Sequence, residues 1–199
     1  MGALVSHSLL LRASDQVSDT ELVSRALAGD RWGREMLYRR HAGRLLGLTT
    51  RLLANRGDAE EIVQDTFITG FAQLAALREP AAVGAWLGQI AISLVRRRIR
   101  RARLLRRLGL DRGTDDATLE ALGDPGLTPE DRTDLALVDR ALSSINAACR
   151  IAWMLRRVEG LPLAEVATMC DCSLATAKRR ITEADRRVAE HVGGEWGEP

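Results

Sequence analysis

The sequence predicts an all-α protein: two small helical domains of about four helices each, joined by an acidic flexible linker, with a helix-turn-helix at the end of the second. Apolar residues recur every three or four positions over most of the chain, and strand-like alternation is hard to find. Aromatic residues make up only 4% of the 199 residues, which is more typical of small helical domains than of sandwiches or barrels. A chain of this length can bury two modest cores.

The first domain is predicted over residues 18–108, after an N-terminal lead at 1–17 that has no clear periodicity. Ser18 and Glu21 fit a capping box for a short helix. A longer helix from residue 31 to 54 carries apolar residues at helical spacing, and His41 within that stripe is expected to be a packing residue. The sequence at 55–57, Asn-Arg-Gly, predicts the end of this helix by turn chemistry.

An acidic helix is predicted next, with Asp58 as its N-cap and acidic residues in its first turn, where they oppose the helix dipole favourably. Its buried stripe is expected at Val63, Phe67, Gly70, Phe71 and Leu74. The residues off that stripe are Glu61, Gln64, Asp65 and Ile68. An ordinary solvated face is one interpretation of them, and a surface that binds a basic partner is the other.

A helix rich in arginine follows a break at residues 78–80. Eight arginines lie between residues 96 and 107, and no acidic residue occurs between Glu79 and Asp111. Like charges one turn apart repel, so a face of uniform sign indicates an anionic partner, most simply phosphates. Trp86 could stack on a base or fill the core. The apolar stripe is expected at Leu87, Ile90, Ala91, Leu94, Val95, Ile99 and Ala102, and Arg96, Arg100, Arg103 and Arg107 share another face.

Residues 109–130 are predicted to be the linker, because they are acidic and rich in glycine and proline. The second domain is predicted over residues 131–192, with a tail at 193–199. Two amphipathic helices come first, and Pro162 then opens a short third one. The turn at 170–172 leads to Ser173, a good N-cap for the last helix, so the end of this domain reads as a helix-turn-helix. Its packing residues are expected to be Val166, Ala167, Leu174, Ala177 and Ile181.

Several functions find no support in the composition. The three histidines are scattered, and no nucleophile–base pattern or phosphate loop occurs, so we expect no enzyme. Three cysteines, an odd number, indicate reduced thiols in a cytoplasmic protein, and no histidine or second cysteine pair completes a metal site. We therefore expect no metal and no cofactor. No segment approaches the roughly 20 apolar residues that a membrane span needs, so no membrane insertion is expected.

Two motifs carry a family resemblance. The run DAEEIVQDTF at 58–67, followed by AWLGQIA at 85–91, resembles the second conserved region of bacterial sigma factors. The runs RVEGLPLAEVA at 157–167 and SLATAKRRI at 173–181 are similar to the fourth region of the same proteins. The group with only these two regions is the extracytoplasmic-function (ECF) one. The resemblance covers roughly residues 19–190.

The resemblance implies a protein that binds core RNA polymerase and directs it to the minus-ten and minus-thirty-five elements of promoter DNA, and it implies an anti-sigma factor as a further partner. By position, the polymerase-binding residues are Asp58, Glu61, Gln64 and Asp65. The minus-ten residues are Arg78, Glu79, Trp86, Arg96, Arg97, Arg100 and Arg103. The minus-thirty-five residues are Ser173, Ala175, Thr176, Lys178, Arg179 and Arg180.

Two departures from the family pattern bear on promoter melting: Ser93 and Arg97 stand where the family usually has Asn and Asp. They keep open a degenerate sigma-like protein that binds polymerase or an anti-sigma factor without starting transcription. An ordinary helix-turn-helix repressor is a third possibility, but it leaves the acidic helix unexplained, and repressors usually dimerise on paired half-sites.

Overall fold

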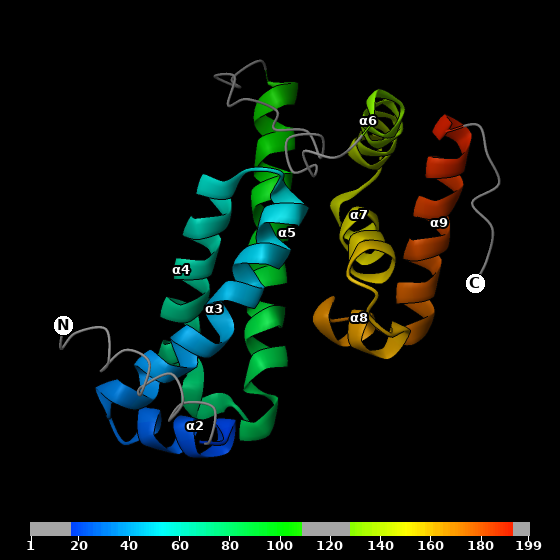
Figure 1. Cartoon of the computed structure of the whole chain (residues 1–199). Helices are drawn as coiled ribbons and strands as arrows, with labels where there is room; N and C mark the ends of the chain where they lie inside the picture. The colour runs from blue at the N-terminus through cyan, green and yellow to red at the C-terminus, as the bar shows by residue number, and fades with distance from the viewer. Residues whose placement is uncertain (1–16, 109–127, 193–199) are drawn as a thin grey trace.

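The computed structural model describes residues 17–108 and 128–192, and every regular element in these two ranges is helical, as predicted (Figure 1). The lead at 1–16, the linker at 109–127 and the tail at 193–199 lie outside the described residues. The first range contains α2 (Asp19–Leu27), α3 (Arg31–Leu53), α4 (Arg56–Gln73) and α5 (Val83–Arg107), with 3-10 turns at Leu74–Ala76 and Pro80–Ala82. The second contains α6 (Pro129–Ser144), α7 (Ala147–Trp153), a π-helical turn (Met154–Val158), α8 (Leu163–Met169) and α9 (Leu174–Val192).

The helix starts show which side chains set the boundaries. Ser18 caps α2 as predicted, because its side chain accepts a hydrogen bond from the Glu21 amide at 3.2 Å. The predicted cap of the acidic helix is wrong. The side chain of Asn55 accepts from the Asp58 amide at 2.9 Å, so Asn55 is the N-cap of α4 and Asp58 lies in its first turn. Asparagine caps as well as aspartate does, and it comes three residues earlier.

The end of α3 also differs from the prediction. The helix stops at Leu53, and the next residue, Ala54, takes the left-handed conformation with φ 53°. The Asn-Arg-Gly sequence therefore does not form a separate turn: its asparagine caps α4, and its other two residues are the first two of that helix. One left-handed residue is enough to join two long helices, as at many helix C-termini.

The core of the first domain lies between α2, α3, α4 and the start of α5. Leu22, Met36, Phe67 and Leu87 are almost fully buried in it. Gly70 permits the close approach of α4 and α5, since a Cβ atom there would lie 2.7 Å from the Leu87 Cδ2 atom. The stripe predicted for α4 is confirmed, with Phe71 only partly buried.

The second domain packs α7 and α9 against each other. Trp153 is buried, and its Nε1 atom donates a hydrogen bond to Asp185 at 2.9 Å. Arg157 forms an ion pair with the same carboxylate at 3.0 Å. Ala177 and Ile181 of α9 are buried, as predicted, beside Val166 and Ala167 of α8. Leu174 is a wrong prediction: this first residue of α9 is 54% exposed.

The two domains share one hydrophobic core, which the sequence did not predict. Ile92, Val95 and Ile99 of α5 belong to the same buried cluster as Ile151 and Leu155 of the second domain. Ile92 lies off the predicted apolar stripe of α5, whose own members divide between the first-domain core, with Leu87 and Ala91, and the shared core, with Val95 and Ile99. Figure 1 shows α5 running between the rest of the first domain and helices α7 and α8.

Three polar contacts also join the domains. Arg51 of α3 pairs with Glu159, the Gln89 side chain donates to the Thr168 carbonyl at 3.1 Å, and Arg103 donates to the Ser143 carbonyl at 3.2 Å. Among the helices that the structure describes, none is both long and apolar enough to cross a membrane. The domain limits at 18–108 and 131–192 stay predictions, although α6 already begins at Pro129.

Candidate nucleic-acid interface

The four predicted polymerase-binding residues lie along α4, and two of them already form ion pairs within the protein. Arg98 of α5 forms ion pairs with Asp58 and, at 3.0 Å, with Glu61. The hydrogen bond that Arg98 donates to Asp58 raises the pKa of Arg98, with a smaller contribution from Glu61. Gln64 and Asp65 are exposed, and Asp65 makes no ion pair with any residue that the structure describes. A partner therefore meets two unpaired polar groups beside two that Arg98 already neutralises.

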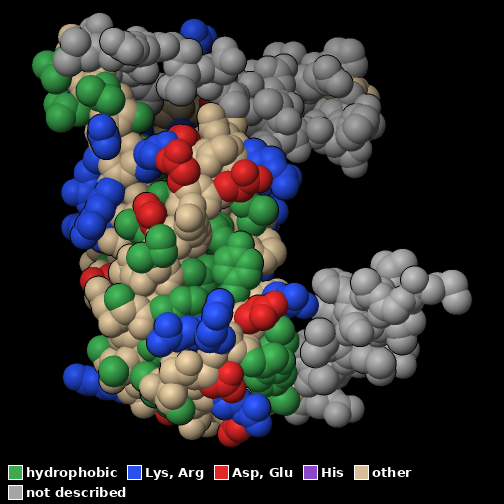
Figure 2. Space-filling view, turned by 90° about the vertical axis from the view of Figure 1, so that its left-hand side faces the viewer, with side chains coloured by type: hydrophobic (Ala, Val, Ile, Leu, Met, Phe, Trp, Pro, Cys, Tyr) green, Lys and Arg blue, Asp and Glu red, His purple; other side chains and the backbone are tan. Residues whose placement is uncertain are grey.

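Exposed apolar side chains lie next to these polar ones. Ile68, one turn beyond Asp65 on α4, is 60% exposed, and Tyr38 of α3 is 47% exposed. The Tyr38 ring packs on the buried Phe67 ring with 4.8 Å between centroids, so it is held in place at the surface. Figure 2, which views the molecule from the α4 side, shows hydrophobic side chains gathered among acidic and basic ones.

The sequence predicted one of these two exposed apolar side chains and not the other. Ile68 lies off the predicted buried stripe of α4, so the spacing of apolar residues already places it at the surface, although one exposed isoleucine is by itself ordinary. Tyr38 gave no signal, because only the folded chain brings α3 beside α4. A mixed apolar and acidic surface of this kind is typical of a protein–protein interface.

The segment from Arg78 to Trp86 runs from the break after α4 into the first turn of α5. Arg78 and Glu79 are exposed, and the 3-10 turn that follows starts with Pro80 at its first position. Trp86 is half-buried: its ring lies 3.6 Å from the position of a Cβ atom on Gly70. Trp86 thus packs on the first domain with one side and keeps another side accessible.

The arginines of α5 point in three directions instead of forming one face. Arg97, Arg100, Arg101 and Arg107 are exposed. Arg98 is paired with α4, as described above. Arg96 and Arg103 are half-buried on the side of the second domain, where Arg103 donates to Ser143. Arg96 and Arg103 are therefore less exposed than Arg100 and Arg107, so the four do not form one exposed face in this docked arrangement. That they contact phosphates stays a prediction.

The helix-turn-helix consists of α8, a turn at residues 170–173, and α9. Asp171 takes the left-handed conformation with φ 49°, and the Cys172 amide donates to the Ala167 carbonyl at 3.0 Å. Ser173 caps α9 by accepting from the Thr176 amide at 3.2 Å. These bonds hold the start of α9 clear of α8, which is the position of the DNA-reading end in this motif.

The residues predicted to contact the minus-thirty-five element divide by exposure. Thr176 and Arg180 are half-buried, and Arg180 is turned toward α5 and the domain interface. The Nη1 atom of Arg180 is buried without a hydrogen-bond acceptor. The exposed members are Ser173, Ala175, Lys178 and Arg179.

The three cysteines and His41 lie within the described residues. The three cysteines, Cys149, Cys170 and Cys172, are free thiols, and burial raises the pKa of Cys170 to about 11, with a further contribution from Cys172. No group of three potential metal ligands occurs in the two described ranges. His41 is largely buried, and burial lowers its pKa although Asp19, 3.3 Å away, opposes the shift.

Comparison with known proteins agrees with this geometry. The model for Sigma-70 region 2 matches residues 37–104, and the model for Sigma-70, region 4, matches residues 135–187. The RNA polymerase sigma-H factor of Pseudomonas aeruginosa is 28% identical over 87% of this chain and 93% of its own length. The ECF RNA polymerase sigma factor SigM of Mycobacterium tuberculosis is 29% identical over 88% of this chain and 85% of its own length.

Two solved structures share the fold. CnrH, in complex with the cytosolic domain of CnrY, matches with a TM-score of 0.59 at 21% identity, over 90% of this chain and 99% of that one. The sigma factor RpoE, in complex with the anti-sigma factor NepR from Bartonella quintana, matches with a TM-score of 0.55 at 21% identity, over 81% of this chain and 97% of that one. With both conserved regions present in order on an all-α fold, the chain belongs to the extracytoplasmic-function group of RNA polymerase sigma factors, which direct the polymerase to promoters.

Proposed function

We propose that this sigma factor binds core polymerase through the face of α3 and α4 that exposes Gln64, Asp65, Ile68 and Tyr38. The unpaired Asp65 carboxylate supports an electrostatic contact with a basic surface, and Ile68 and Tyr38 supply apolar area that would be buried on binding. Asp58 and Glu61 form the edge of this surface. A basic partner must compete there with Arg98, so we expect them to contribute less than Asp65 does.

Promoter contact is proposed on two surfaces. In the first domain, Arg78, Glu79, Trp86, Arg97 and Arg100 would meet the minus-ten region, since each has an exposed or half-exposed side chain. In the second domain, the exposed start of α9 would meet the minus-thirty-five element, with Ser173, Ala175, Thr176, Lys178 and Arg179.

Three of the predicted DNA contacts, Arg96, Arg103 and Arg180, face the other domain in this structure. We propose that the domains separate when the protein binds polymerase and promoter, which would bring these three arginines onto DNA as well. The docked form is then one arrangement of the free protein, which the protein leaves when it binds polymerase and promoter. The contacts between domains that break on opening are the shared core around Ile92 and the Arg51–Glu159 pair.

An anti-sigma factor is proposed as a further partner. The support is that both related structures named above are complexes, one with the anti-sigma factor NepR and one with the cytosolic domain of CnrY. We also propose that the protein acts in the cytoplasm, where polymerase and promoter meet, and that it carries out no covalent chemistry of its own.

The single observation that supports the function best is the match of both sigma regions, in order, to domains that expose an acidic α4 and a basic start of α9. Reconstituted run-off transcription tests it. Core polymerase with the full chain should transcribe a cognate promoter, and a pre-melted bubble template should be transcribed more strongly if Ser93 and Arg97 weaken melting. Transcription of neither template, with core binding confirmed, would contradict initiation and leave an interaction-only protein.

A further inference from the structure

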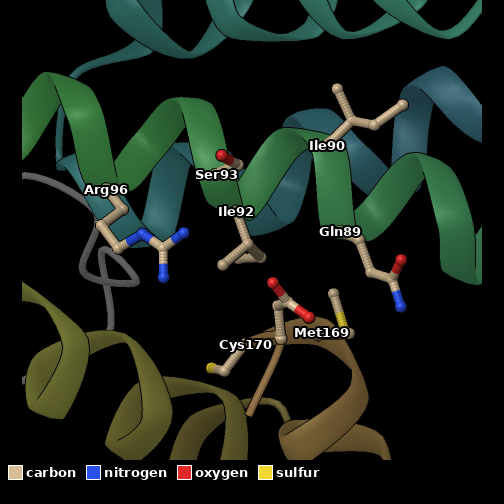
Figure 3. A pocket seen from close by; sticks show the side chains of 8 residues that line it. Gln89, Ile90, Ile92, Ser93, Arg96, Met169 and Cys170 are labelled. Carbon is tan, nitrogen blue, oxygen red and sulfur yellow. The ribbon is translucent and has the colours of Figure 1, made fainter. Parts of the chain in front are cut away.

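Two arginines from different domains line one small cavity at the domain interface. Arg96 comes from α5 and Arg180 from α9, and the rest of the wall is Ile92, Ala148, Ile151 and Cys170. Figure 3 shows Arg96 reaching from α5 across the interface, with Cys170 on the opposite side. No carboxylate lines this cavity.

Neither guanidinium has a counter-ion. Arg96 and Arg180 form no ion pair with any residue in the described ranges. The positive charge of each lowers the pKa of the Cys170 thiol, against the larger effect of burial. The Nε atom of Arg96 and the Nη1 atom of Arg180 are buried without an acceptor. Buried N–H groups almost always have a partner, and a native structure with two such orphans calls for a bound water or ion. Two like charges in a low-dielectric interface favour the ion.

The neighbouring side chains do not supply the missing negative charge. The Cys170 thiol stays protonated at neutral pH, because burial raises its pKa to about 11. Asp171 lines the adjacent larger cavity, which it shares with Arg96, yet it pairs with neither arginine. That larger cavity has a volume of about 290 Å³ and adds the polar side chains of Gln89 and Ser93.

We propose that a small tetrahedral oxyanion of the phosphate type binds between Arg96 and Arg180 and holds the two domains together. It would bind in the larger cavity, accept a hydrogen bond from the Arg96 guanidinium there, and reach the Arg180 N–H group through a water in the small cavity. The planar fork of arginine suits such an anion well. The small cavity that both arginines line, at about 10 Å³, has room only for a water. The anion therefore occupies the larger cavity beside Arg96, and a water in the small cavity links it to Arg180.

The site has a consequence that rests on the proposed function. Arg96 and Arg180 are predicted to bind DNA phosphates once the domains open, so the oxyanion and the promoter compete for the same two groups. Inorganic phosphate would then inhibit promoter binding by more than its ionic strength explains. Binding of the anion itself, by contrast, needs neither polymerase nor DNA.

Thermal unfolding of the full chain in inorganic phosphate, with chloride at matched ionic strength as reference, tests the site. Phosphate should raise the Tm by roughly 5 °C at about 100 times its dissociation constant. Arg96→Gln or Arg180→Gln should weaken its apparent affinity about tenfold or more, since each removes a charge-assisted hydrogen bond. Arg97→Gln and Arg179→Gln are the matched controls: each removes the same charge one position away, from an exposed side chain, and should leave the affinity unchanged.

Small-angle X-ray scattering of the same proteins gives a second readout. Phosphate should reduce the radius of gyration of the wild-type chain and of the two controls, but not of the Arg96 or Arg180 variants, whose helicity circular dichroism would check. Replacing phosphate by ATP distinguishes the free ion from the phosphate end of a nucleotide. Equal effects of phosphate and chloride, or equal losses in all four variants, would overturn the proposal whether or not the chain initiates transcription.

Discussion

Arg51 of α3 forms a bidentate ion pair with Glu159 across the domain interface, although the two residues are 108 positions apart in the sequence. Glu159 directly follows the π-helical turn. The Arg51 Nε atom donates to one carboxylate oxygen, and the Nη2 atom donates to the other at 2.8 Å. The hydrogen bond from Arg51 to Glu159 raises the pKa of the arginine despite partial burial. This pair fixes the relative orientation of the two domains at one edge of their shared core.

Removing this pair should loosen the docking without unfolding either domain. For Arg51→Ala we expect a loss of about 0.2–1 kcal/mol in unfolding free energy, because the arginine side chain is 43% exposed and the pair is screened by solvent. The radius of gyration should rise at the same time. Arg56→Ala is the control, since Arg56 pairs with Glu60 inside α4. An unchanged scattering profile for Arg51→Ala would mean that the apolar core alone sets the domain arrangement.

Reversing the charge of Asp65 should abolish binding to core polymerase while leaving the helix content intact. The exposed carboxylate has no internal partner in the described ranges, so Asp65→Arg disturbs no contact of the free protein. Glu60→Arg makes the same change on the same helix outside the proposed surface. Co-purification with core enzyme and circular dichroism measure the two effects. Equal binding by both variants would remove Asp65 from the interface.

The exposed residues at the start of α9 should divide into base readers and phosphate binders. Lys178 and Arg179 are both exposed, and successive helical residues turn by roughly 100°, so they cannot face DNA in the same way. Alanine at a base-reading position should cost about 1–3 kcal/mol at one base pair of the minus-thirty-five element. Alanine at a phosphate-binding position should weaken binding to all sequences alike and lower the salt dependence. Competition binding with a set of single-base promoter variants separates the two outcomes, and no effect from either substitution would contradict DNA reading by α9.

His41 should make the protein less stable in acid. Burial lowers the pKa of His41 below its ordinary 6.5, so as the pH falls below 6.5 the unfolded chain takes up a proton that the folded chain refuses. Stability contributed by the neutral imidazole is therefore lost between pH 6.5 and the lower pKa of the folded state. Each unit of that pKa difference corresponds to about 1.4 kcal/mol. Denaturant unfolding at several pH values should show a shallower acid loss for His41→Gln than for the wild type, and parallel curves would contradict the assignment.

Two glycines of α3 should respond to alanine with opposite signs. A Cβ atom on Gly33 would lie 2.8 Å from the Arg25 Cβ atom and 3.0 Å from the Ala26 backbone nitrogen, which cannot move aside. Gly33→Ala should therefore destabilise the protein by about 1–3 kcal/mol. Gly43 has nothing within 4 Å of that position, so Gly43→Ala should stabilise the helix by roughly 0.5–1 kcal/mol. Paired denaturant titrations measure both, and the same sign for both would contradict the packing of α2 on α3.

The sequence predicted the features that depend on neighbours along the chain. The turn at 170–172, the cap at Ser173, and the buried Ala177 and Ile181 follow from local spacing and turn chemistry. The cap of α4 was assigned to the wrong residue because Asn55 offers the same chemistry as Asp58. The spacing of apolar residues does not show which of two capping residues starts a helix when they lie about one turn apart, as Asn55 and Asp58 do.

Contacts between distant residues escaped prediction. Arg98 meets Asp58 across 40 residues, and no spacing rule selects it from eight arginines on one helix. Ile92 was missed because a single apolar stripe was assigned to α5, while α5 is buried on two sides. The half-burial of Arg96 and Arg103 follows from that second buried side, so the directions of the arginines predicted to bind DNA could not be derived without the docked second domain.

The shared core also has a consequence during synthesis on the ribosome. Helix α5 ends at Arg107, whereas α7, which covers Ile92 and Val95, begins at Ala147. At synthesis rates of about 5–20 residues per second, the 39 residues between these points (108–146) take roughly 2–8 s to make. During that interval the nascent first domain presents an uncovered apolar face. Chaperones, or a polymerase that binds the chain as it emerges, would meet the protein before its own second domain does.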